Sequence, residues 1–232
     1  MFKIERAIIM AAGKGTRLSP ITKKTPKPLV KVNGIAMIET VINALKKNNI
    51  NEIYIVVGYK KEQFSYLKDK YENIELIENP YYDSCNNISS LYVAREHINN
   101  TFIIDGDQII KNPNILNTQF EKSGYCASWT ESTNEWLMTV EDNKVLKCSR
   151  DGGKNGYQLY GISMWSQEDG QRLKKHVEKE FICNNNNQIY WDDVPMFVHF
   201  DEYDLGIRLI NHEDIFEIDS YDDLVRLDSS YK

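Results

Sequence analysis

A short stretch near the N-terminus has the residue types and spacing of a phosphate-binding loop. Residues 7–10 read Ala-Ile-Ile-Met, which predicts a strand buried on both faces. Four small residues that follow would let backbone N–H groups approach an anion: Ala11, Ala12, Gly13 and Gly15. Lys14, Arg17 and Lys27 add positive charge to the same stretch. Together these residues predict a site for a triphosphate.

This loop differs from the two common glycine motifs that bind nucleotides. Gly15 follows Gly13 after one residue and no third glycine appears, so neither the P-loop nor the dinucleotide-binding pattern is present. A glycine pair alone is equally typical of a strand-to-helix turn. The addition of Arg17 and of Thr25-Pro26-Lys27-Pro28 makes that reading unfavourable. The combined pattern resembles the sugar-nucleotide pyrophosphorylase type of nucleotidyltransferase.

Two aspartates that directly follow apolar strands are candidate metal ligands. Asp107 follows the predicted strand 101–104, and Asp219 ends the apolar stretch that begins at residue 216. Two carboxylates that converge on a triphosphate would hold Mg²⁺, which prefers a few carboxylates together with phosphate oxygens. For Asp105 a turn or capping role is an equally good reading. Glu217 shares a strand face with Asp219 and is a candidate ligand-binding carboxylate.

Aromatic residues lie beside carboxylates in two polar, loop-like segments. These segments read Asn134-Glu135-Trp136 and Tyr190-Trp191-Asp192-Asp193. A quaternary ammonium group cannot donate hydrogen bonds, so aromatic faces and nearby negative charge are what bind it. The two segments therefore predict a cage for such a group. Core packing is the alternative reading, and it is the favoured one for Trp129 and Trp165, which fall in predicted strands.

Strands and helices alternate in the first half of the chain, which predicts right-handed βαβ units and a largely parallel sheet. The apolar patterns predict strands at 7–10, 53–57, 74–77 and 101–104 and helices at 37–47, 64–71 and 89–97. Ligands of such sheets lie beyond the carboxyl ends of the strands. The loops that follow the strands, at 11–17, 58–59, 79–90 and 105–107, are therefore expected to converge on one crevice.

From residue 125 onward the pattern changes to antiparallel strands. The sequence predicts strands at 125–130, 137–140, 145–148 and 157–165, a helix from Ser166 to about residue 181, and a C-terminal helix capped by Ser220. We therefore expect an α/β fold with a Rossmann-like, mixed, mostly parallel sheet flanked by helices, and a small antiparallel portion. No linker divides the chain, so residues 1–232 are expected to form a single domain.

Composition and charge exclude several classes of protein. A net charge of −6 over 232 residues argues against broad nucleic-acid binding but allows a local basic pocket for one nucleotide. No apolar stretch approaches the roughly 20 residues that span a bilayer, so no membrane insertion is expected. The four cysteines form no Cys-x-x-Cys pair and no signal peptide is visible. We expect a cytoplasmic protein with reduced thiols, without a zinc site or a disulfide framework.

Motifs along the whole chain resemble those of the bacterial CTP:phosphocholine cytidylyltransferases, which serve the choline decoration of cell-surface polymers. Besides the N-terminal loop they are Val57-Gly58-Tyr59-x-x-Glu62-Gln63-Phe64, Asn86-Asn87, Asp105-Gly106-Asp107, Thr133-Asn134-Glu135-Trp136, Tyr190-Trp191-Asp192 and Glu217-Ile218-Asp219-Ser220. The resemblance implies a Mg²⁺-dependent reaction of CTP with phosphocholine that gives CDP-choline and pyrophosphate. It also implies a nucleotide-binding half, residues 1–124, and an acceptor-binding half, residues 125–232.

The same resemblance implies a role for each candidate residue. Lys14, Arg17 and Lys27 are the implied catalytic cations, and Lys27 would bridge the α-phosphate and the attacking phosphocholine. Asp107 and Asp219 are the implied Mg²⁺ ligands. The implied nucleotide-binding residues are Ala11, Ala12, Gly13, Gly15, Thr16, Gly58, Tyr59, Asn87, Ser89 and Asp105. The implied choline-binding residues are Trp136, Tyr190, Trp191, Asp192 and Glu217.

Two alternatives remain open from the sequence. The fold could serve another acceptor, namely 2-aminoethylphosphonate, phosphoethanolamine or a sugar 1-phosphate, although sugar hydroxyls require hydrogen-bonding side chains and fit the aromatic segments less well. A catalytically silent nucleotide sensor is disfavoured, because every candidate catalytic group is present. Gln108 stands where the family often has asparagine, so the resemblance does not assign this side chain a contact with the nucleotide or the substrate.

Overall fold

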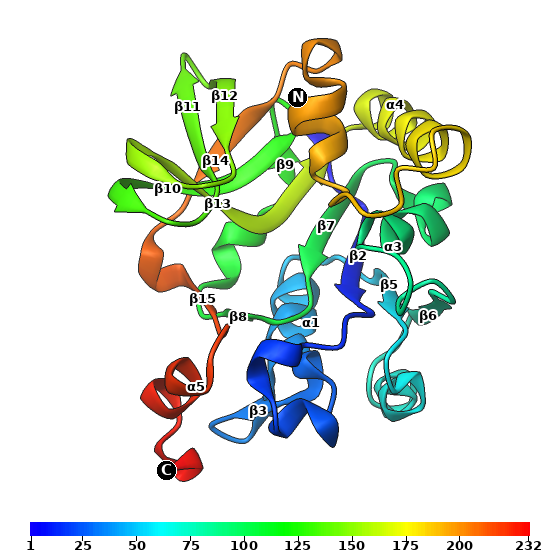
Figure 1. Ribbon diagram of the computed structural model, residues 1–232, viewed down its shortest axis with the longest axis vertical. Helices are drawn as coiled ribbons and strands as arrows, with labels where there is room; N and C mark the ends of the chain where they lie inside the picture. The colour runs from blue at the N-terminus through cyan, green and yellow to red at the C-terminus, as the bar shows by residue number, and fades with distance from the viewer.

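A nine-stranded mixed sheet forms the centre of the computed structural model, which describes residues 1–232 (Figure 1). The strand order is β12-β11-β13-β7-β2-β5-β6, with β10 paired to β13 and β14 paired to β10. The strands of this sheet are β2 (Arg6–Ala11), β5 (Glu52–Val57), β6 (Ile74–Glu78), β7 (Thr101–Asp105), β10 (Gly124–Thr133), β11 (Leu137–Glu141), β12 (Lys144–Ser149), β13 (Gly153–Trp165) and β14 (Gly206–Leu209).

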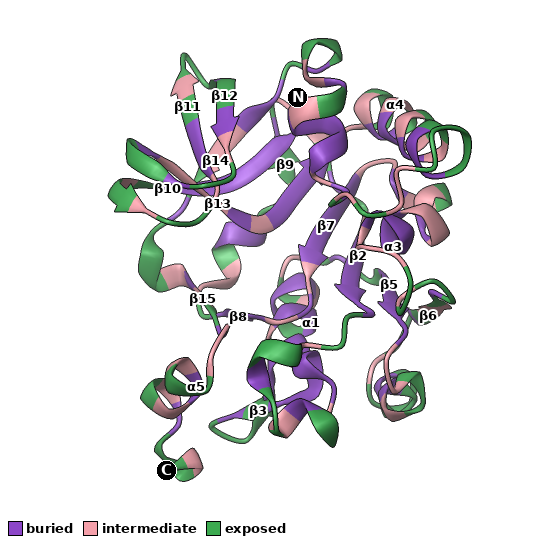
Figure 2. Ribbon diagram, in the orientation of Figure 1, coloured by how far each residue is buried: buried purple, intermediate pink, exposed green.

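Strands β7, β2, β5 and β6 are parallel, and helices cover both of their faces. Successive side chains of β2 point to opposite faces, as strand geometry requires. Ile9 packs in a core cluster with α1 (Met37–Lys47), whereas Ile8 packs in a second cluster with α3 (Ile88–Val93) and α4 (Gln167–Glu178). Figure 2 shows β2, β5 and β7 buried along most of their length, whereas β6 at the edge is partly exposed. The continuous apolar run that opens the sequence is thus explained by burial on both faces.

The second half of the chain extends this sheet with antiparallel strands. Strand β13 pairs antiparallel with β10 along one side and with β7 and β11 in succession along the other, and β12 pairs with β11. The expected α/β class, with a mixed sheet that is parallel in its first half, is confirmed. Strand β13 is long, so its residues before Ile162 extend past the carboxyl end of β7.

A two-stranded ribbon below the main sheet connects the middle of the chain to its end. Strand β8 (Gln108–Ile110) pairs antiparallel with β15 (Ile215–Glu217), so that Gln108 lies opposite Glu217. The segment then enters α5 (Tyr221–Leu227), where Ser220 and Asp223 form the capping box that the sequence predicts at Ser220. This pairing brings Asp107 and Asp219 to the same place.

Several short elements complete the fold. They are β1 (Phe2–Lys3), β3 (Lys31–Val32), β4 (Ile35–Ala36), β9 (Gln119–Phe120) and α2 (Tyr66–Lys70), with β1 paired to β9 and β3 to β4. None of the helices combines the length and the apolar character needed to cross a bilayer.

Two predicted helices end earlier than expected. Helix α3 stops at Val93 and a separate 3₁₀ turn covers Arg95–His97. Helix α4 ends at Glu178 and continues as a π-helical turn over Lys179–Cys183. This wider turn places the carboxylate of Glu180 inside the protein, where it accepts hydrogen bonds from Asn184 and Asn186 and pairs with His199. Periodicity alone does not reveal such a buried polar contact.

Candidate active site

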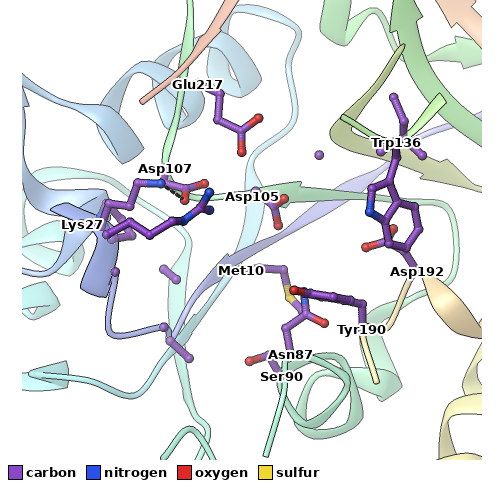
Figure 3. A pocket seen from close by; sticks show the side chains of 18 of the residues that line it. Met10, Lys27, Asn87, Ser90, Asp105, Asp107, Trp136, Tyr190, Asp192 and Glu217 are labelled. Carbon is purple, nitrogen blue, oxygen red and sulfur yellow. Dashed lines mark ion pairs between the residues drawn. The ribbon is translucent and has the colours of Figure 1, made fainter. Parts of the chain in front are cut away.

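A cavity of about 530 Å³ lies beyond the carboxyl ends of β2 and β7, as expected for this kind of sheet (Figure 3). Charged groups occupy one side of it, with Lys27 and Asp107 labelled there in Figure 3, and Trp136 and Asp192 occupy the other side. Asp105, at the end of β7, lies between them. The cavity therefore has a charged end, which contains groups of both signs, and an aromatic end.

The loop after β2 lines the charged end with backbone and small side chains. The lining residues from this segment are Met10, Ala11, Ala12, Gly13, Gly15 and Arg17. Gly15 adopts a left-handed conformation with φ of 59°, and a Cβ at this position would lie 2.7 Å from the Cβ of Lys27. A glycine is thus required both by the turn and by the close approach of Lys27.

Two predicted residues of this loop point elsewhere. The side chain of Lys14 forms an exposed ion pair with Asp83, and this hydrogen bond raises the pKa of the Lys14 ammonium group. Thr16 begins the 3₁₀ turn Thr16–Leu18. Neither residue lines the 530 Å³ cavity.

Lys27 is the centre of an ion-pair network at the charged end of the cavity. Its Nζ atom lies 2.8 Å from Asp107 Oδ2 and 3.0 Å from Asp219 Oδ1, and Arg17 Nη2 lies 2.8 Å from the same Asp219 oxygen. The Lys27 side chain is only 6% exposed. Burial alone would lower the pKa of Lys27, but the two carboxylates outweigh it and raise that pKa above its ordinary value.

Two further carboxylates face this network. Burial is the largest cause that raises the pKa of Asp105 well above its ordinary value, and the negative charges of Asp107, Asp192 and Glu217 add to it. Burial and the charges of Asp107 and Asp219 raise the pKa of Glu217 to about 8. Crowding of like charges around a partly enclosed cavity is a typical property of a site that binds cations.

The aromatic end of the cavity consists of Trp136 and Tyr190. Their rings are 6.1 Å apart at an interplanar angle of 89°, so they form two perpendicular walls. Phe197 packs edge-on against Trp136 at 5.5 Å. The carboxylates of Glu135, Asp192 and Glu217 line the same cavity. The expected combination of aromatic faces and carboxylates is therefore present at Trp136 and Tyr190.

Trp191 does not join these walls, contrary to the expectation from the sequence. Its side chain is only 3% exposed and does not line the cavity. It stacks on Tyr125 at 6.2 Å and meets Trp165 edge-on at 6.2 Å. The turn directs Tyr190 and Asp192 toward the cavity and the ring between them toward the core.

A second cavity of about 180 Å³ adjoins the glycine loop. Asn87 and Ser90 line both cavities, and Ser89 lines the smaller one. The hydroxyl groups of Ser89 and Ser90 accept hydrogen bonds from the buried amide of Asn79, at 2.9 and 3.0 Å. This arrangement of small polar groups beside the phosphate loop is suited to a base and a ribose.

Gly58 and Tyr59 support the glycine loop and line neither cavity. The backbone N–H of Tyr59 donates to the carbonyl of Ala12 at 3.0 Å, and its hydroxyl donates to the carbonyl of Thr22 at 3.1 Å. A Cβ at Gly58 would lie 2.7 Å from the Tyr82 side chain. These contacts assign both residues a structural role at the loop, and their contact with the nucleotide stays a prediction.

Sequence reasoning missed several lining residues, including Ser90, Leu159 and Gly161. Leu159 and Gly161 are two positions apart on β13 and so share one face of that strand. A Cβ at Gly161 would lie 2.1 Å from Asp105 Oδ2 and 2.7 Å from Gln108 Nε2. The glycine makes room for these two side chains, and no local pattern signals this requirement.

Comparisons with known proteins identify the relatives of this chain. The nucleotidyl transferase family model matches residues 6–129. A 2-aminoethylphosphonate cytidylyltransferase of Lancefieldella rimae is 40% identical over 229 residues, covering 97% of this chain and 92% of the relative. A choline-phosphate cytidylyltransferase of Streptococcus pneumoniae is 36% identical over 228 residues, covering 98% of each.

Solved structures agree as well. The crystal structure of the CTP:phosphocholine cytidylyltransferase from Streptococcus pneumoniae superimposes with a TM-score of 0.91 at 36% identity, and the match covers 100% of both chains. An inositol-1-phosphate CTP transferase of T. maritima has the same fold, with a TM-score of 0.77 at 19% identity over 100% of this chain and 98% of that one.

Proposed function

The chain belongs to the nucleotidyl transferase family, and we propose that it transfers the cytidylyl group of CTP to phosphocholine, giving CDP-choline and pyrophosphate. The single observation that carries the choice of acceptor is the perpendicular pair Trp136 and Tyr190 in the same cavity as the Lys27 network. Trimethylammonium groups bind to aromatic faces near negative charge. The cavity then accommodates the headgroup at one end and the reacting phosphates at the other.

The proposed reaction is a direct displacement at the α-phosphorus. An oxygen of the phosphocholine phosphate forms a bond to the α-phosphorus, the bond from that phosphorus to the bridging oxygen of the β-phosphate breaks, and pyrophosphate leaves with the electron pair. Positioning and charge stabilisation provide most of the catalysis in such transfers. The Lys27 ammonium group and the Arg17 guanidinium group stand where they can neutralise charge on these oxygens. No protein nucleophile is required.

A divalent metal fits the residues at the charged end. Asp107 and Asp219 both reach the same ammonium group within 3.0 Å, so their oxygens converge on one point beside the glycine loop. Carboxylate oxygens together with phosphate oxygens are the donors that Mg²⁺ prefers. These two aspartates would hold the ion, which when bound would neutralise developing charge on the phosphates.

A second candidate acceptor is 2-aminoethylphosphonate. The Lancefieldella rimae relative, which is 40% identical, bears that name. The cavity also contains the carboxylates of Glu135, Asp192 and Glu217, which can accept hydrogen bonds from a primary ammonium group. A trimethylammonium group would use the aromatic faces instead, so the two acceptors make different demands on the same residues.

Pyrophosphate release tests the proposal directly. The purified protein is assayed with CTP and Mg²⁺ against phosphocholine, 2-aminoethylphosphonate, phosphoethanolamine and glucose 1-phosphate in parallel, and ATP, GTP and UTP replace CTP in a second series. We expect the highest kcat/KM with CTP and phosphocholine. A preference for an amine or a sugar phosphate would reject the choline assignment and keep the family. No release with any pair would favour a nucleotide sensor.

A further inference from the structure

Two segments that lie side by side at the cavity are joined by a set of hydrogen bonds that we name the clasp. Its first segment, residues 84–87, belongs to the small cavity beside the glycine loop. Its second segment, residues 187–191, leads into the aromatic end through Tyr190. The segments are about a hundred positions apart in the chain, as the separation of 104 residues between Asn87 and Trp191 shows. Contact between them is therefore purely tertiary.

Four hydrogen bonds make up the clasp. The backbone N–H of Asn86 donates to the carbonyl of Asn187 at 2.8 Å, and its side-chain amide donates to the carbonyl of Gln188 at 3.1 Å. The Gln188 amide donates back to the carbonyl of Ser84 at 2.8 Å. The backbone N–H of Trp191 donates to the side-chain oxygen of Asn87 at 2.8 Å.

The bond between Asn87 and Trp191 lies closest to the chemistry. Asn87 lines both cavities, and its Nδ2 donates to no group of the protein. Its Oδ1 holds the backbone between Tyr190 and Asp192, which both line the aromatic end. The Trp191 ring is buried against Tyr125, so this backbone is fixed on two sides. One amide side chain thus connects the nucleotide side of the site with the wall that receives the acceptor.

We infer that Asn87 is a positioning residue for the acceptor as well as a nucleotide contact, an inference that rests on the proposed function. Its N–H groups remain available to the nucleotide, and its oxygen sets the position of Tyr190 and Asp192. The remaining bonds of the clasp, through Asn86 and Gln188, hold the same two segments together farther from the cavity. Asn87 therefore contacts the nucleotide and also holds in place the residues that bind the acceptor, Tyr190 and Asp192.

Two substitutions at position 87 separate these roles. Asn87→Asp keeps an oxygen that accepts from the Trp191 N–H but removes the amide donor, whereas Asn87→Ala removes both. In pyrophosphate-release kinetics both variants should raise the KM for CTP. Only Asn87→Ala should also raise the KM for phosphocholine, by roughly three- to tenfold relative to Asn87→Asp, the effect expected for one lost hydrogen bond.

A peripheral variant and a matched control complete the experiment. Gln188→Ala removes a clasp bond at an exposed residue outside the cavity and should raise the KM for phosphocholine about twofold at an unchanged KM for CTP. Gln171→Ala, an exposed glutamine on α4 without a hydrogen-bond partner, should change neither. Thermal unfolding of each variant verifies that it is folded at the assay temperature.

The outcomes distinguish this inference from the proposed function. Equal KM values for phosphocholine in Asn87→Ala and Asn87→Asp, in an active enzyme, would overturn the positioning role and leave the cytidylyltransferase assignment untouched. If the unmodified protein releases no pyrophosphate with any acceptor, the proposed function fails first. Direct titration of choline into the protein, followed by the change in intrinsic tryptophan fluorescence that is absent in Trp136→Ala, then still compares the two variants without turnover.

Discussion

The ammonium nitrogen of Lys27 lies 3.0 Å from Asp219 Oδ1, although 192 residues separate the two positions in the chain. The contact is made because β8 and β15 pair, which returns the end of the chain to the mouth of the cavity. Lys27 therefore contacts two parts of the site: the glycine loop that precedes it in the chain and the carboxylates of Asp107 and Asp219.

Lys27→Met should reduce kcat by roughly 10²- to 10³-fold, the range seen when one preorganised group that stabilises transition-state charge is removed. The side chain is buried with two carboxylates, so their repulsion becomes uncompensated in the variant. Pyrophosphate-release kinetics at saturating CTP measure the effect. Lys24→Ala, an exposed lysine three residues away, is the matched control and should retain full activity.

Asp107→Ala and Asp219→Ala should each weaken Mg²⁺-dependent turnover. Each change removes a carboxylate from the point where the two converge, so the apparent affinity for Mg²⁺ should fall at least about tenfold, the scale of one lost charged contact. Titration of activity with Mg²⁺, and its loss on addition of EDTA, provides the measurement. Asp201→Ala, an exposed aspartate without an ion pair, serves as the control.

An Asp107→Ala protein with normal pyrophosphate release would remove this residue from the metal site. The sensor alternative makes a different prediction for the unmodified protein: CTP binds, as calorimetry would show, but no pyrophosphate appears with any acceptor. The two readings are thus separated before any variant is made.

Trp136→Ala and Trp191→Ala should differ in kind. Trp136 forms a wall of the cavity, so its loss should raise the KM for phosphocholine by about 2- to 30-fold, corresponding to ~0.5–2 kcal/mol for one aromatic face, with little change in the unfolding temperature. Trp191 is buried against Tyr125 and Trp165, so its loss should destabilise the fold by about 3–5 kcal/mol.

Denaturant unfolding and kinetics on both variants check this contrast. Trp191→Phe keeps an aromatic ring in the core and should recover much of the lost stability. A Trp191→Phe protein that is fully stable but has a strongly raised KM for phosphocholine would contradict this prediction. Trp191 would then contact the acceptor and not only the core.

The sequence predicts a residue of this site when local patterns determine its position, and fails when tertiary contacts do. The glycine loop and Asp107 follow from local patterns, because each ends a parallel strand and such ends meet at one edge. Trp136 and Trp191 occupy similar local contexts, beside carboxylates in polar loops, yet one ring lines the cavity and the other is core. That choice depends on which tertiary neighbour, Tyr190 or Tyr125, is available to each ring.

Other parts of the site depend on contacts between distant segments. Gly161 is needed because Asp105 and Gln108 occupy the space its side chain would take, and Ser90 enters the site through its bond to Asn79. Neither requirement leaves a periodic signal in the sequence. The sequence predicts a strand near β15 but neither β8 nor its pairing with β15, although it identifies as candidates the two aspartates that this pairing brings together.

Acceptor binding should depend on pH through the carboxyl group of Asp192. Burial raises the pKa of Asp192 from its ordinary 3.8 to about 7, with a further rise from the charge of Asp193 and a partial offset from the neighbouring Tyr125 hydroxyl. Asp192 is therefore mostly neutral below pH 7 and charged above it. Since a cationic headgroup is attracted only to the charged form, choline should bind more tightly as the pH rises from 6 to 8.

Choline itself is the appropriate probe, because its charge does not change with pH whereas a phosphate monoester titrates near pH 6. The change in intrinsic tryptophan fluorescence that is absent in Trp136→Ala reports its binding. Asp192→Asn should make the profile less steep, and the part that remains belongs to Glu217, whose pKa is raised to about 8. The same raised pKa means that the folded state holds this proton more tightly than the unfolded state. The contribution of Asp192 to stability is therefore present near pH 4 and is lost as the pH rises to about 7. Relative to Asp192→Asn, the unmodified protein should accordingly lose unfolding temperature between pH 5 and pH 8, and a constant difference across that range would contradict the assigned pKa.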